Sequence, residues 1–126
     1  MNLIDSCGWL EFLADGPLAD KYAPYFETPQ EVITPAIVVY EVAKKVWRER
    51  GREAALAVAA QMQQTRIVPL DFRLSLAATE AAIRWKLPLA DAVVYATAQA
   101  NHSRVITSDA HFEGLPGVVF VPREAK

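Results

Sequence analysis

The stretch Arg104-Val105-Ile106-Thr107-Ser108-Asp109 is the clearest β-strand of the sequence, and an acidic residue follows it directly. Its β-branched residues favour an extended backbone. The same context occurs at the start of the chain, where Asp5 follows the short apolar run 2–4. Because the carboxyl ends of parallel strands lie at one edge of a sheet, both carboxylates should face the same crevice. This pattern predicts a ligand-binding edge that carries two acids.

The rest of the chain alternates short apolar strands with helices. Further strands are expected at 32–33, 66–70 and 118–121, and helices at 6–15, 18–26, 35–50, 52–64, 71–85 and 89–101. Thr34-Pro35 is expected to supply the N-cap and the first residue of the third helix. The helix after Pro88 is apolar nearly all round, which is typical of a buried helix. Since parallel strands need helical crossovers, this order predicts an α/β fold with a parallel sheet.

Length and composition restrict the class of protein. The 126 residues have a mass of 13.9 kDa, which suits one domain, and 52% hydrophobic residues are enough for a packed core. The apolar runs are shorter than the roughly 20 residues that span a bilayer, and the start does not have the pattern of a signal peptide. The single cysteine excludes an internal disulfide. These features predict a soluble protein of the cytoplasm.

Charge is distributed unevenly along the chain. Residues 1–43 contain seven acids and one base, whereas residues 44–86 contain nine bases and four acids. This separation fits a cation site beside an anion-binding surface. Charge alone favours the simpler interpretation of solvated helix faces.

Two further acids stand in apolar surroundings. Asp91 lies in the first turn of the apolar helix, and Glu41 interrupts an apolar helical run. Each acid also has an ordinary structural role to consider. Asp5 and Asp109 suit helix N-caps, worth about 1 kcal/mol each, Asp91 suits the helix dipole, and Glu41 can pair with Lys45.

The four acids together favour a shared cation. Glu41 and Asp91 lie in runs that are expected to be buried. An unpaired buried carboxylate costs several kcal/mol or becomes neutral. A divalent cation bound by the whole set would remove that penalty.

These segments resemble, in order, the PIN-domain ribonucleases. The resemblance rests on Leu3-Ile4-Asp5-Ser6, Tyr40-Glu41-Val42, Leu89-Ala90-Asp91-Ala92 and Val105-Ile106-Thr107-Ser108-Asp109, whose acids are 36, 50 and 18 residues apart. It covers residues 1–126 as a single PIN-like domain, and the size is similar to that of VapC-type toxins. It implies a three-layer α/β/α sandwich with a short, mostly parallel central sheet.

The resemblance implies an endoribonuclease that depends on Mg²⁺ or Mn²⁺, the toxin of a toxin–antitoxin pair. Its catalytic and metal-binding acids would be Asp5, Glu41, Asp91 and Asp109, with Ser6 and Thr107 as auxiliary polar residues. We expect Asp5 and Asp91 to be direct or water-bridged ligands, and Glu41 and Asp109 to orient metal-bound waters. A cognate antitoxin and a homodimer are implied as partners.

One departure from the family concerns the residues after the fourth acid. Some members carry a further acid there, whereas this chain has Ala110-His111-Phe112. That difference places a second metal ion in doubt.

Basic residues near Glu41 are candidates for RNA binding. Lys44, Lys45 and Arg48 lie one to two helical turns beyond it, so they are placed to contact phosphates that flank the scissile bond. A solvated helix end explains the same residues equally well. The three tryptophans suit base stacking, although tryptophan is more often a core residue.

Other functions fit less well. One alternative is a catalytically inactive PIN-like module that binds RNA or protein. A receiver or an aspartate-dependent phosphatase would use Asp5 as phosphate acceptor, but the receiver needs a second acid beside it, and the phosphatase needs an acid where Cys7 stands. Cys7 with His102 or His111 is a weak candidate for a nucleophile or a zinc site, and Cys7 is expected to pack as a small hydrophobe.

Overall fold

The computed structural model describes residues 1–123, which form a central sheet of five short strands, all paired in parallel. Across the sheet the strands have the order β3-β2-β1-β4-β5. Their bounds are β1 Asn2–Ile4, β2 Val32–Pro35, β3 Arg66–Val68, β4 Arg104–Thr107 and β5 Val118–Phe120. The predicted α/β class with a short parallel sheet is confirmed.

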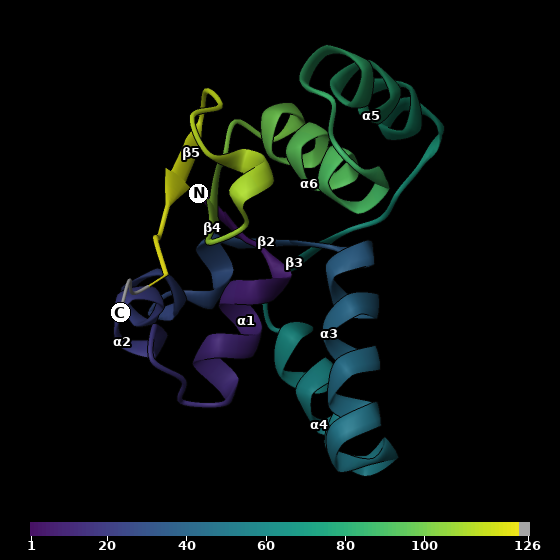
Figure 1. Ribbon diagram of the computed structural model, residues 1–126. Helices are drawn as coiled ribbons and strands as arrows, with labels where there is room; N and C mark the ends of the chain where they lie inside the picture. The colour runs from purple at the N-terminus through teal and green to yellow at the C-terminus, as the bar shows by residue number, and fades with distance from the viewer. Residues whose placement is uncertain (124–126) are drawn as a thin grey trace.

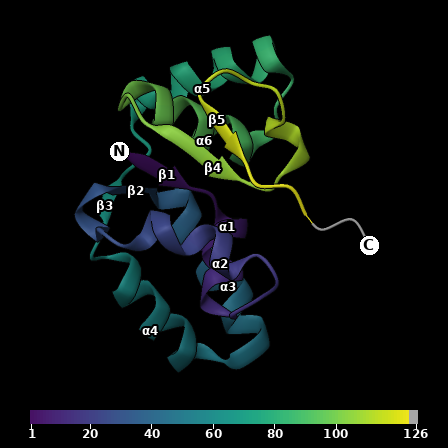
Figure 2. The ribbon, with the colours of Figure 1, turned by 90° about the vertical axis from the view of Figure 1, so that its left-hand side faces the viewer.

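Helices cover both faces of the sheet, which gives the predicted three-layer sandwich (Figures 1 and 2). The chain moves from β1 to β2 to β3 in one direction, and then crosses back beyond β1 to β4. Because such crossovers are right-handed, the reversal puts the later helices on the opposite face. One layer holds α1 Ser6–Leu13, α2 Ala19–Tyr22, α3 Ala36–Arg50 and α4 Arg52–Met62, and the other holds α5 Phe72–Trp85 and α6 Leu89–Ala100.

Helix α6 is buried, as its apolar sequence predicts. Residues 92–98 are all buried, because α6 packs against the sheet on one side and against α5 on the other. The opposite side of the sheet packs on α1 and α3, and the strands contribute fully buried residues such as Leu3, Ile33 and Ile106. No helix within residues 1–123 is long and apolar enough to cross a membrane.

The start of α3 differs from the prediction. Pro35, not Thr34, is the N-cap residue, because β2 continues through Pro35 and pairs it with Val68. The buried hydroxyl of Thr34 lies 2.6 Å from that of Thr65 and makes no cap. The predicted cap is therefore wrong, since a contact with a residue 31 positions away decides the conformation.

The predicted helix 18–26 is also divided. Helix α2 ends at Tyr22, and a 3₁₀ helix, Ala23–Phe26, follows it. Pro24 has no backbone N–H to donate, so the α-helical hydrogen bonding does not continue. Further 3₁₀ turns at Pro29–Glu31 and Ala110–Phe112 were not predicted.

Gly8 brings α1 close to α2. A Cβ atom on Gly8 would lie 2.5 Å from a ring carbon of Tyr22, so only glycine permits this approach without a shift. The Tyr22 hydroxyl then lies 2.6 Å from that of Ser108, the residue after β4. The contact fixes the backbone just before Asp109.

Candidate active site

The carboxyl ends of β1 and β4 form the base of a cleft of about 510 Å³. These strands are neighbours, yet the chain leaves β1 toward one face and reaches β4 from the other. Such a reversal is where open α/β sheets bind ligands. Asp5 and Asp109 both line the cleft. The expectation that they face one crevice is therefore confirmed.

Asp5 is held at the floor of the cleft by hydrogen bonds to both of its oxygens. The backbone N–H of Ser6 donates to Oδ1 at 2.8 Å, and the hydroxyl of Thr107 donates to Oδ2 at 2.9 Å. The same hydroxyl accepts a hydrogen bond from the N–H of Asp109 at 2.9 Å. Asp5 thus caps α1 and also lines the cleft, and Thr107 links two of the predicted acids.

Asp91 and Glu41 reach the cleft from opposite helical layers. Asp91 lies in the first turn of α6, and its side chain is 14% exposed. Glu41 comes from α3, which contacts α6, and it lines the same cleft. The expected burial around Glu41 is wrong in part, because Glu41 is only half-buried and Tyr40 is 60% exposed. Within residues 1–123, Lys45 forms its ion pair with Glu49, at 2.8 Å, and not with Glu41.

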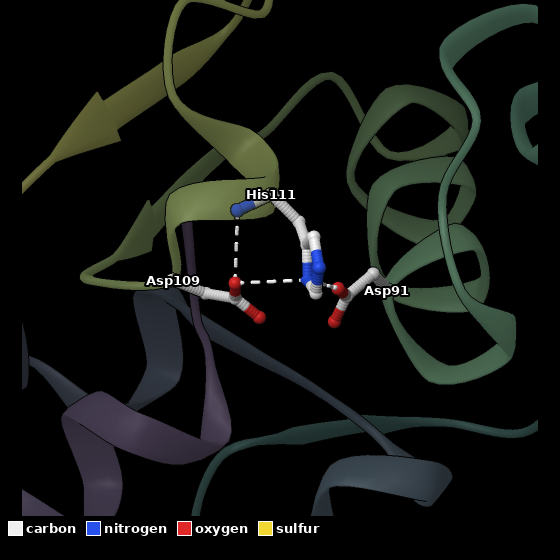
Figure 3. Close-up of side chains that lie close together, drawn as sticks. All are labelled: Asp91, Asp109 and His111. Atoms are coloured by element: carbon white, nitrogen blue, oxygen red, sulfur yellow. Dashed lines mark hydrogen bonds and ion pairs between the residues drawn. The ribbon is translucent and has the colours of Figure 1, made fainter.

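His111 lies between two of the acids, as Figure 3 shows. Its Nδ1 is 2.8 Å from Oδ2 of Asp91 and 3.1 Å from Oδ1 of Asp109. Its backbone N–H also donates to Asp109 at 2.9 Å. Ligand atoms of these three residues lie within 4.8 Å of one another, and Asp5 and Glu41 line the cleft outside this tight group.

The sequence suggested His111 only as a partner of Cys7, and its place between the acids was not predicted. A signal was present, since His111 lies in the stretch 110–112 directly after Asp109, where the sequence departs from the expected pattern. Tyr22 and Arg123 were also missed. Arg123 lines the cleft from the segment after β5, and no local pattern predicts that placement.

Burial and the neighbouring acids raise the pKa values of the carboxyls in the cleft. The pKa of Asp91 is raised to about 7, mainly by burial and then by the charges of Asp109 and Asp5, while contact with His111 opposes the shift. Burial is also the main cause of the raised pKa of Asp5 and of Glu41, and a hydrogen bond from the Ser6 side chain opposes the shift at Glu41. The folded protein holds these carboxylates at a free-energy cost that a bound cation would offset.

Cys7 contributes its sulfur to the wall of the cleft, so the expectation that it packs as a small hydrophobe is wrong in part. The sulfur accepts a hydrogen bond from the N–H of Ser108 at 3.4 Å and lies 3.5 Å from the Thr107 hydroxyl. Burial and the charge of Asp5 raise the pKa of the Cys7 thiol. A nucleophile needs the opposite shift, because the thiolate is the reactive form.

The basic candidates line a second cleft beside the first. This cleft, of about 270 Å³, is lined by Tyr40, Glu41, Lys44, Lys45, Arg48 and Glu49. Glu41 belongs to both clefts. Lys44 lies over the Tyr40 ring, 5.5 Å from its centre. Of the tryptophans, Trp9 is in the core, whereas Trp47 on α3 is half exposed.

The model of the PIN domain family matches residues 3–118. The chain belongs to the PIN domain family. Its fold is similar to that of a toxin–antitoxin complex from Klebsiella pneumoniae, with a TM-score of 0.81 and 25% identity over 99% of this chain and 100% of that one. It is also similar to VapC20 of Mycobacterium tuberculosis, a toxin that cleaves the sarcin–ricin loop, with a TM-score of 0.78 and 20% identity over 98% of this chain and 100% of that one.

DNA-bound VapBC of Salmonella typhimurium has the same fold, with a TM-score of 0.75 and 14% identity over 97% of this chain and 98% of that one. A sequence search of curated proteins gives no match. The PIN fold therefore extends over nearly the whole chain, although identity to these structures is low.

The raised pKa of Asp91 predicts how stability changes with pH. A carboxyl with a higher pKa in the folded than in the unfolded protein binds its proton more tightly when folded. The free energy of unfolding then falls as pH rises from 3.8 to about 7. We expect the PIN domain in chelator to lose stability from pH 5 to pH 8. Asp91→Asn should be more stable than wild type at pH 8 by roughly 1–2 kcal/mol.

Urea unfolding at pH 5, 6, 7 and 8 measures this effect. Asp20→Asn, which changes an exposed carboxylate on α2, is the matched control and should follow the wild type. An Asp91→Asn profile as steep as that of wild type would show that Asp91 titrates alike in both states.

Proposed function

We propose that this PIN-domain protein is a divalent-metal-dependent endoribonuclease and acts as the toxin of a toxin–antitoxin pair. The observation that carries the proposal is the convergence of Asp5, Glu41, Asp91 and Asp109 on one cleft from four separate elements. Membership of the PIN family and similarity to toxins along nearly the whole chain support it.

The donor set of the cleft fits a hard divalent cation. Burial and, after it, the neighbouring carboxylates raise the pKa of Asp91, and ligand atoms of Asp91, Asp109 and His111 lie within 4.8 Å of one another. Carboxylate oxygens suit Mg²⁺ and Mn²⁺. We therefore assign Asp5, Asp91, Asp109 and Glu41 as direct or water-bridged ligands. A bound cation would supply an activated water and stabilise the charge that develops on phosphorus.

The chain's own groups orient this chemistry. Thr107 fixes the Asp5 carboxylate, and the backbone N–H of His111 donates a hydrogen bond to the Asp109 carboxylate. Glu41 is the acid best placed to accept a proton from the attacking water. It stands apart from the tight group, and burial raises its pKa above that of an ordinary carboxyl, which makes its carboxylate a stronger base.

The second cleft supports an RNA-binding role for Lys44 and Arg48. Both side chains line this cleft next to Glu41, so their positive charges would bind the phosphates beside the scissile phosphate. Lys45 shares this cleft, but Glu49 already neutralises its charge. We therefore expect Lys45 to contribute less to RNA binding than Lys44 or Arg48.

Two apolar surfaces of the chain suit interfaces with protein partners. The proposed partners are an antitoxin and a second copy of this chain, both in the cytoplasm. A groove of about 260 Å³ between α1, α3 and α4 has an apolar lining that includes Leu10, Leu13, Val46 and Val58. On the other layer, Phe72 and Ile83 of α5 are 80% and 77% exposed. Exposed apolar surface of this kind marks protein interfaces.

A phosphate-acceptor role for Asp5 has less support. Both of its oxygens already accept hydrogen bonds from the protein, and a thiol stands at position 7, where a phosphatase needs an acid. An inactive PIN-like module remains the alternative that the next experiment separates from the enzyme.

Cleavage of RNA tests the proposed activity. In Mn²⁺, the wild type should cleave at least one member of a panel of single-stranded and stem-loop RNAs, and a chelator should stop it. Asp91→Asn and Glu41→Gln should each reduce the cleavage rate at least about 100-fold, because each removes a charged ligand or base. Glu80→Gln changes an exposed acid on α5, outside both clefts, and should keep wild-type activity. Cleavage by Asp91→Asn at the wild-type rate would contradict the proposal, and RNA binding without cleavage would favour the inactive module.

Removal of a basic side chain beside Glu41 should weaken RNA binding without changing the cleft that contains the four acids. In the Asp91→Asn background, Lys44→Ala and Arg48→Ala should each raise the Kd for RNA about 3–10-fold at low salt and reduce the salt slope by about one. Fluorescence anisotropy measures both effects. Arg104→Ala removes a charge at the opposite end of β4 and serves as control. Equal Kd values for RNA in all three variants would show that Lys44 and Arg48 do not contact the RNA.

A further inference from the structure

His111 is a nitrogen donor in a cleft of oxygen donors. Its Nδ1 lies 2.8 Å from an oxygen of Asp91 and 3.1 Å from one of Asp109 (Figure 3). Neighbouring ligands of an octahedral ion, at bonds of about 2.0–2.2 Å, are about 2.8–3.1 Å apart. The nitrogen therefore lies from each of the two oxygens at the spacing of a neighbouring ligand, and the three ligand atoms all lie within 4.8 Å of one another.

The position of this imidazole is fixed by the backbone. His111 is the middle residue of the 3₁₀ turn Ala110–Phe112, and its N–H bonds to the carboxylate of Asp109. The next residue, Phe112, is fully buried and anchors the turn in the core. The ring is thus held beside Asp91 by a short, anchored segment, even though its side chain is 58% exposed.

We propose that His111 binds the divalent cation directly through Nδ1, together with Asp91 and Asp109, and that the mixed nitrogen and oxygen site prefers Mn²⁺ to Mg²⁺. This inference rests on the proposed metal-dependent function. Mg²⁺ favours oxygen ligands, whereas imidazole suits transition metals. One nitrogen ligand therefore favours binding of Mn²⁺ over binding of Mg²⁺. Binding through Nδ1 leaves the imidazole hydrogen on Nε2.

Pulsed electron paramagnetic resonance of the Mn²⁺-loaded protein reports the ligand directly, since a coordinated nitrogen modulates the echo of the metal. The chain has two histidines, so one substitution separates them. His102 is exposed and has a positive φ of 52°, which asparagine tolerates, so His102→Asn is the matched control. We expect nitrogen modulation in wild type and in His102→Asn, and its loss in His111→Gln.

Calorimetry with Mn²⁺ and Mg²⁺ gives a second readout. His111→Gln should lower Mn²⁺ affinity on the order of tenfold and change Mg²⁺ affinity less. His111→Asp, which supplies an oxygen ligand at this position, should shift the preference toward Mg²⁺.

The outcomes separate this inference from the proposed function. Bound Mn²⁺ without nitrogen modulation in wild type, or modulation that persists in His111→Gln, would overturn ligation by His111 and leave the metal-dependent nuclease standing. Absence of Mn²⁺ binding by wild type, with no RNA cleavage, would overturn both.

Discussion

The pairing of β1 with β4 is the constraint on which the site depends. Ile4 pairs with Ile106, and the N–H of Asp5 donates to the carbonyl of Ile106 at 3.1 Å. This register places the Asp5 carboxylate against the Thr107 hydroxyl, which in turn accepts from the N–H of Asp109. A shift of one residue would turn the side chains of one strand to the other face and separate the two acids. Leu3 and Ile106 are fully buried in the core, which makes such a shift unfavourable.

The reversal of the chain at this pair also explains why acids from opposite layers meet. Helix α3 leaves the carboxyl edge on one face and α6 begins at the same edge on the other, so Glu41 and Asp91 approach from both sides. The raised pKa values of Asp5, Glu41 and Asp91 show that this arrangement opposes folding while the carboxylates are ionised. Strain of this kind is typical of functional sites, where stability is given up for binding or catalysis. Thr107 and Ser6 provide hydrogen bonds that offset part of it.

Local pattern predicts one part of this structure and tertiary contact decides the rest. The strands that precede Asp5 and Asp109 and the buried helix α6 follow from apolar runs and proline positions, so the sequence predicts the layers and the shared edge. Helix α3 is capped by Pro35 and not by Thr34, because the Thr34 hydroxyl contacts Thr65, which is far along the chain. The position of His111 depends equally on α6, which brings Asp91 to it. The catalytic roles of the four acids stay predictions, since geometry places them in one cleft without assigning their chemistry.

Titration of Mn²⁺ by calorimetry into wild type, Asp5→Asn, Asp91→Asn and the double variant tests the central claim, that acids from the sheet edge and from α6 hold one cation. Asparagine preserves the size of each side chain and removes its charge. The account predicts that each single variant binds Mn²⁺ at least about tenfold more weakly than wild type, and that the two effects are not additive, because both residues act on the same ion. Wild-type affinity in both single variants would contradict it, and would return Asp5 to a helix cap and Asp91 to a partner of the helix dipole.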